Sequence, residues 1–151
     1  MGREGVQRAL MLVWDGWRDA ARRPLVERIH GLLSAFHNET VSLDSKTGRL
    51  PPFGTLASQG TAQAGETYLV ADGEDRRWCC LVHEGRLGEG EVAAFEAFCR
   101  RQAPRPSRKV VIARDGLELN ARLLAKSVSM WVWEPDDMNL LFLLYGQPRL
   151  K

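Results

Sequence analysis

The sequence has few cysteines, a small net charge and no long apolar run. Its three cysteines, Cys79, Cys80 and Cys99, form neither the paired spacing of a zinc site nor the disulfide framework of a secreted domain. We therefore expect reduced thiols that pack as small apolar side chains. No charged segment leads into an apolar stretch with a cleavage site, and no apolar run reaches membrane-spanning length. These absences predict a cytoplasmic protein without a membrane partner.

The net charge of +2 is too small to indicate nucleic-acid binding by itself. The basic residues do gather locally, however, in two groups: Arg18, Arg22, Arg23 and Arg28, and then Arg100, Arg101, Arg105, Arg108 and Lys109. If the members of the second group share a face, they can contact phosphates, which makes nucleic acid a possible partner. A solvated helix face and a solvated loop are the commoner explanation of such groups.

The length and composition are those of one globular domain. A chain of 151 residues with 44% hydrophobic and 26% charged residues can bury a substantial core. We expect a single domain over residues 1–151, in which an N-terminal helical region covers 1–37. Within that region, Val6, Leu10, Val13 and Trp17 recur at helical spacing, although residues 9–14 also suit a strand. A second helix is predicted over 24–37, with Pro24 in its first turn.

Residues 38–65 form the least interpretable part of the sequence. Residues 41–43 suit a short strand, but glycine and proline then punctuate a segment rich in serine, threonine and alanine. A structureless loop of this length is unusual inside a compact domain. The segment is interpreted as loop-rich, with a lid, a linker or an unidentified element as the alternatives.

Clear alternation of elements begins at Glu66. Residues 66–71 and 78–83 predict the two strands of a hairpin, and an amphipathic helix follows with Val92 and Phe95 on its apolar face. The strands predicted at 110–113 and 130–133 are each followed by a helix. Strand, helix and strand with short connections imply parallel pairing. We therefore predict an α/β fold over residues 66–146, with a central mixed sheet flanked by helices.

The order of these elements resembles the PD-(D/E)XK, or restriction endonuclease-like, superfamily, in particular its Mrr-like branch. The similarity covers residues 66–146 and is carried by Lys109–Gly116, by Asn120–Lys126, and by Met130–Trp133 with Asp136–Leu141. The resemblance implies a restriction endonuclease-like fold and a role in bacterial defence or DNA processing. Active members place one acid on the first hairpin strand and an acid-x-Lys triplet on the second. Their carboxylates hold Mg²⁺, which activates water for attack on the phosphate.

In this chain the pattern is incomplete. Glu66 matches the first acid, whereas the triplet reads Leu81-Val82-His83, so a leucine replaces the second acid and a histidine the lysine. The candidate catalytic residues are thus Glu66 and His83, with no metal ligand set and Mg²⁺ implied only if the domain is active. Glu84, Glu91 or Glu96 could supply a displaced acid, or His83 could act as a base or metal ligand.

The sequence leaves three functional hypotheses. The first is a catalytically degenerate nuclease-like domain that recognises nucleic acid or a protein partner. The second is an active Mg²⁺-dependent endonuclease that uses Glu66 with a displaced acid. The third is an interaction or dimerisation module without nucleic-acid binding, which would use Trp131 and Trp133 if they project from an edge strand. Burial in the core is the commoner fate of such tryptophans.

Overall fold

A mixed β-sheet organises the structure, a computed structural model that describes residues 23–43 and 46–150. Its strands lie in chain order: β3 (Thr55–Gly60), β4 (Glu66–Asp72), β5 (Arg77–His83), β6 (Arg108–Ala113) and β7 (Trp131–Trp133). The first three form an antiparallel meander, and β5, β6 and β7 pair in parallel. The prediction of an α/β fold with a central mixed sheet is therefore confirmed.

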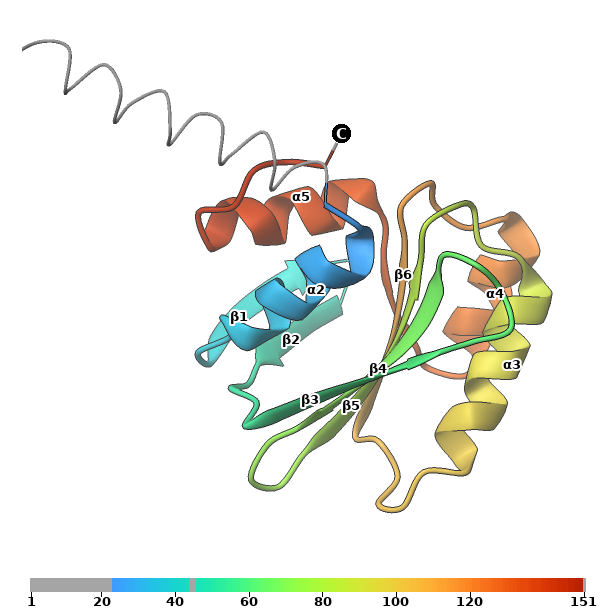
Figure 1. Cartoon of the computed structure of the whole chain (residues 1–151), viewed down its shortest axis with the longest axis horizontal. Coiled ribbons are helices and arrows are strands. Elements are labelled where there is room, and N and C mark those ends of the chain that lie inside the picture. The colour runs from blue at the N-terminus through green and yellow to red at the C-terminus, as the bar shows by residue number, and fades with distance from the viewer. Residues whose placement is uncertain (1–22, 44–45, 151) are drawn as a thin grey trace, which may run out of the picture.

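Helices cover both faces of this sheet (Figure 1). One face carries α2 (Leu25–Ser34) and α5 (Pro135–Leu144), together with a separate hairpin of β1 (Glu39–Leu43) and β2 (Lys46–Leu50). The other face carries α3 (Glu89–Arg100) and α4 (Leu119–Ser127). These helices form where the sequence places its amphipathic stretches, because each presents one apolar stripe to the sheet.

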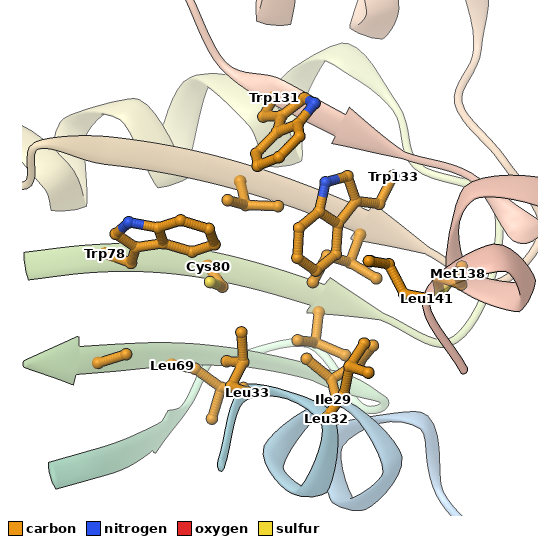
Figure 2. Packing of buried hydrophobic residues seen from close by; sticks show 14 of the residues in the cluster. Ile29, Leu32, Leu33, Leu69, Trp78, Cys80, Trp131, Trp133, Met138 and Leu141 are labelled. Carbon is orange, nitrogen blue, oxygen red and sulfur yellow. The ribbon is translucent and has the colours of Figure 1, made fainter. Parts of the chain in front are cut away.

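The α2-side core contains the three tryptophans of the described residues. Trp78 of β5 and Trp131 and Trp133 of β7 pack edge to face, with ring centroids 5.4–6.3 Å apart. Figure 2 shows them beside Leu33 of α2 and Leu141 of α5. Trp131 and Trp133 are fully buried, so they form no exposed aromatic patch, although β7 is an edge strand. Edge-to-face contacts between aromatic rings stabilise a core beyond the burial of apolar area alone.

The α3-side core has smaller side chains than the α2-side core and contains no tryptophan. It joins Tyr68, Cys79 and Leu81 of the sheet to Phe95 and Phe98 of α3, with further contributions from α4. Residues alternate between the two cores along β4, β5, β6 and β7, as the pleat requires. Cys79 and Cys80 consequently point to opposite faces, and both thiols are free and buried.

Residues 38–65 are not a loop. They contain β1, β2 and β3, so the alternative of an unidentified element is the right one and the loop-rich interpretation is wrong. The short strand predicted at residues 41–43 is part of β1, whereas two features conceal β2 and β3 in the sequence. Gly48 occupies the middle of β2, and β3 is exposed along nearly its whole length, which leaves no apolar alternation to detect.

The helix predicted from the spacing of Val6, Leu10, Val13 and Trp17 lies outside the described residues, as do Arg18 and Arg22. In the part that is described, none of the helices combines the length and the apolar character needed to cross a membrane.

Candidate functional site

Glu66 and His83, the two candidate catalytic residues, face each other across the β4–β5 hairpin. They are direct partners in the strand register, and His83 Nδ1 lies 3.1 Å from Glu66 Oε2. The other carboxylate oxygen of Glu66 accepts a hydrogen bond of 2.9 Å from Thr61 Oγ1. Only 5% of the Glu66 side chain and 12% of the His83 side chain are exposed. Both oxygens of this nearly buried carboxylate therefore already have a partner, as burial requires.

A pocket of about 510 Å³ opens beside this pair, between the β3–β4 loop and the start of α3. Its lining includes Thr61, Gln63, Glu66, Tyr68, Glu91 and Ala94. Gln63 Nε2 donates a hydrogen bond of 3.3 Å to Glu91 Oε1. The backbone amide of Glu91, and then Gln63 and His83, hold the pKa of the Glu91 carboxyl below its ordinary value. The pocket thus keeps a charged carboxylate at its rim near neutral pH.

The residues around Glu66 do not fit a Mg²⁺ ion. Leu81, which occupies the position of the expected second acid, is fully buried in the α3-side core. Within residues 23–43 and 46–150, no group of three acidic, histidine or cysteine side chains is placed to hold a metal. Mg²⁺ needs several oxygen ligands in nearly octahedral array, and this corner of the hairpin supplies one carboxylate that is already hydrogen-bonded.

The possible replacement acids are engaged elsewhere. Glu84 accepts hydrogen bonds from the Leu25 amide at the start of α2 and from Arg114 Nε, on the sheet face opposite His83. Glu96 pairs with Lys109 at 2.8 Å and with Arg100 at 3.2 Å. Glu91 is the member of the three that shares the pocket with Glu66.

The predicted phosphate-binding residues do not share one face. Arg108 lies 4.6 Å from the centre of the Trp131 ring on the α2 side, and burial lowers the pKa of its guanidinium. Lys109, the next residue, points to the α3 side, where it pairs with Glu96. Arg100, Arg101 and Arg105 are exposed at the end of α3 and in the loop that follows. The structure therefore leaves these three arginines as the exposed part of the group.

The arginines and the Glu66–His83 pair lie at opposite ends of the sheet. Glu66 and His83 pair at one end of the β4–β5 hairpin, and Asp72 pairs with Arg77 at the other. Six residues of strand separate the ends, which corresponds to about 20 Å. Arg108 begins β6 beside Trp78, at the Arg77 end. One phosphate thus cannot contact both groups.

Arg28, in the first basic group, also has a structural role. Its guanidinium stacks 4.0 Å from the centre of the Phe142 ring and donates to the Pro148 carbonyl. Burial lowers the pKa of this guanidinium, with further lowering from Arg114 and Arg23. Arg28 thus ties α2 to α5 and the chain end rather than facing solvent.

The fold and the site define this chain as an α/β domain with a mixed sheet. A hydrogen-bonded, nearly buried carboxylate–histidine pair lies at one end of that sheet. No family model, curated protein or solved structure matches the chain. Sequence reasoning identified Glu66 and His83 and considered Glu91, but it missed Thr61 and Gln63. These two lie in the segment interpreted as loop-rich, where no motif distinguishes them from other polar residues.

Proposed function

We propose that the protein is a restriction endonuclease-like domain that binds nucleic acid without cutting it. The order of elements supports the fold: an antiparallel meander leads through a helix into two parallel strands, as the resemblance implies. The observation that carries the loss of catalysis is the burial of Leu81 where the second metal-binding acid belongs. Glu66, the remaining acid, already accepts hydrogen bonds from Thr61 and His83.

The surface proposed for nucleic acid is the end of the sheet that carries the exposed arginines. Arg100, Arg101 and Arg105 lie there, and Arg76 is exposed in the β4–β5 turn. Arg76 further lowers the pKa of the Arg108 guanidinium, which places positive charges near one another at this end. A partner with closely spaced negative charges relieves such repulsion, and a phosphate backbone has that property.

The first test measures cleavage and binding in the same samples. The full chain is incubated with plasmid and single-stranded DNA in the presence of Mg²⁺ or Mn²⁺, and binding is measured by gel mobility at several salt concentrations. We expect no cutting, together with binding that weakens as salt increases. Metal-dependent cutting that is lost in both Glu66→Ala and His83→Ala would establish the active endonuclease instead.

Charge reversals at the two ends of the sheet locate the binding surface. The double variant Arg101→Glu and Arg105→Glu reverses two exposed charges on the proposed surface, and Arg105→Glu alone is compared with Arg86→Glu, which reverses one exposed charge just after β5, at the opposite end. We expect the double variant to bind DNA more weakly and to reduce the salt slope by about one to two, since each phosphate contact contributes about 0.9. Equal losses in Arg105→Glu and Arg86→Glu would indicate nonspecific attraction to the whole chain. If neither the wild type nor any variant binds nucleic acid, the result contradicts this proposal and favours the third hypothesis, an interaction or dimerisation module without nucleic-acid binding.

A further inference from the structure

The two edges of the sheet differ in their protection. At one edge, β7 is only three residues long and buried on both faces. At the other edge, β3 is six residues long, and five of its residues are exposed. Its sequence, Thr-Leu-Ala-Ser-Gln-Gly, contains no charged residue and no proline. Proteins usually shield an exposed edge with charges, prolines or bulges, because its unpaired backbone groups attract another strand.

The outward-facing backbone groups of β3 follow from its pairing with β4. The Thr61 amide donates to the Glu66 carbonyl, and Thr61 continues the register in which Gln59 faces Tyr68. Bonded and non-bonded residues alternate along an antiparallel pair. Leu56, Ser58 and Gly60 therefore turn their amides and carbonyls away from β4. No strand of residues 23–43 and 46–150 pairs with this side of β3.

The acidic pocket lies on the α3 side at the end of this open edge. Tyr68 and Glu66 of β4 line it, and directly opposite residues on neighbouring strands point to the same face. A strand added to β3 therefore directs every second side chain toward the pocket side. Among the described residues, the pocket lining contains the carboxylates of Glu66 and Glu91 and no lysine or arginine.

We propose that β3 and the adjacent pocket bind an extended segment of a protein partner, which adds a strand to the sheet and places a lysine or arginine side chain in the pocket. The main-chain hydrogen bonds of β3 supply affinity, and the carboxylate of Glu91 selects the cationic side chain. Burial raises the pKa of Tyr68 in the pocket lining, and the charge of Arg101 lowers it, so Arg101 lies within electrostatic reach of the pocket. Arg105→Glu, which leaves Arg101 in place, is therefore the variant that tests the nucleic-acid proposal independently of this one.

The binding assay uses the full chain and three fluorescently labelled peptides. Each peptide has nine residues of threonine and glutamine with blocked ends, and the central residue is lysine, methionine or glutamate. We expect the lysine peptide to bind at least about tenfold more tightly than the methionine peptide, as for a charge-assisted contact, and the glutamate peptide to bind most weakly.

Three variants separate the strand from the pocket. Ser58→Pro removes an amide that does not bond to β4, so we expect it to abolish binding of all peptides with little change in melting temperature. Glu91→Gln is expected to weaken the lysine peptide and to leave the methionine peptide unchanged. Glu89→Gln, an exposed neighbour in the first turn of α3 outside the pocket lining, is the matched control and should bind like the wild type.

Several outcomes would overturn the proposal. These are no binding of the lysine peptide at about 1 mM, equal binding of the lysine and methionine peptides, or full binding by Ser58→Pro.

Sedimentation at several protein concentrations tests the competing occupant, a second copy of the chain. A dimer that Ser58→Pro dissociates and that the lysine peptide does not compete with would assign the edge to self-association. Arg105→Glu, which leaves Arg101 unchanged, should bind the peptides normally.

Discussion

Glu84 connects three parts of the chain through one carboxylate. It follows β5 directly, accepts the Leu25 amide at the start of α2 and pairs with Arg114 at 2.7 Å. Helix α2 has no capping side chain of its own, since Pro24 occupies its N-cap. Glu84 therefore serves as a cap from a distant part of the sequence, which explains why this acid does not join the Glu66 site.

Replacing Glu84 tests this capping role. We expect Glu84→Ala to lower the free energy of unfolding by about 1–2 kcal/mol, the usual cost of a lost N-cap. Glu84→Gln retains an acceptor oxygen and should lose less, because the partly exposed pair with Arg114 contributes little. Urea denaturation measures both, with Glu74→Ala in the exposed β4–β5 turn as the control. Equal losses for alanine and glutamine would assign the effect to the charge rather than to the hydrogen bond.

The three cysteines should behave as core residues rather than as reactive thiols. Burial raises the pKa of the Cys80 thiol, and the Cys79 side chain, followed by burial, raises that of Cys99, whereas the hydrogen bond with Cys99 lowers the pKa of Cys79. All three thiols are buried, so their shielding from solvent makes their reaction slow whichever way the pKa shifts.

We predict that Ellman's reagent modifies none of the three cysteines in the folded protein at pH 8, and all three in urea. The rate at intermediate urea concentrations should follow global unfolding. Rapid modification of one thiol without denaturant would contradict the assignment and would indicate local opening of β5 or α3. Absorbance of the released thiolate measures the reaction directly.

The β1–β2 hairpin packs against Trp131 on the α2-side face of β7. Trp131 Nε1 donates a hydrogen bond of 2.9 Å to the Leu43 carbonyl, and the indole ring lies directly against Gly48. A Cβ at position 48 would come within 2.8 Å of the Trp131 ring. The glycine that weakens the strand signal in the sequence is therefore the residue that permits the hairpin to approach the tryptophan.

Gly48→Ala should accordingly destabilise the protein by about 1–3 kcal/mol, the range for an overpacked core. The matched control is Gly31→Ala in the middle of α2, where no atom lies within 4 Å of the added methyl group. That change should stabilise the fold by up to about 1 kcal/mol, because alanine favours helix over glycine. Thermal unfolding monitored by circular dichroism measures both. Similar shifts in the same direction would show that the hairpin does not press on Trp131.

The elements that sequence reasoning predicts are those with apolar periodicity or a continuous apolar run. Strands β4 to β7 and helices α2 to α5 carry such patterns, because each packs one or both faces in a core. β3 has almost no buried side chain, so its position depends on backbone pairing with β4. Backbone pairing does not require particular residue types, and the sequence of β3 therefore does not reveal it. The contact between Glu66 and His83 likewise depends on hairpin register, and the partnership with Thr61 depends on the unpredicted end of β3.

The two cores share one set of strands, which bears on how the whole molecule unfolds. Along β5, Trp78, Cys80 and Val82 pack into the α2-side core, while Cys79 and Leu81 pack into the α3-side core. Neither face can lose its packing without disturbing strands that the other face needs. We therefore expect unfolding in one cooperative transition.

The positions of three of the five tryptophans permit a test of this cooperativity. Trp78, Trp131 and Trp133 all lie in the α2-side core, so in a Trp14→Phe and Trp17→Phe background the fluorescence reports one face of the sheet. Leu87→Ala removes a fully buried side chain from the α3-side core, and Leu33→Ala does so on the α2 side. Each should cost about 2–5 kcal/mol. If the sheet couples the faces, Leu87→Ala must shift the fluorescence and circular dichroism transitions in urea together, as Leu33→Ala does. A fluorescence midpoint that stays at the wild-type value in Leu87→Ala, while the circular dichroism transition moves or splits, would mean that the α2-side core is stable without the helices on the other face.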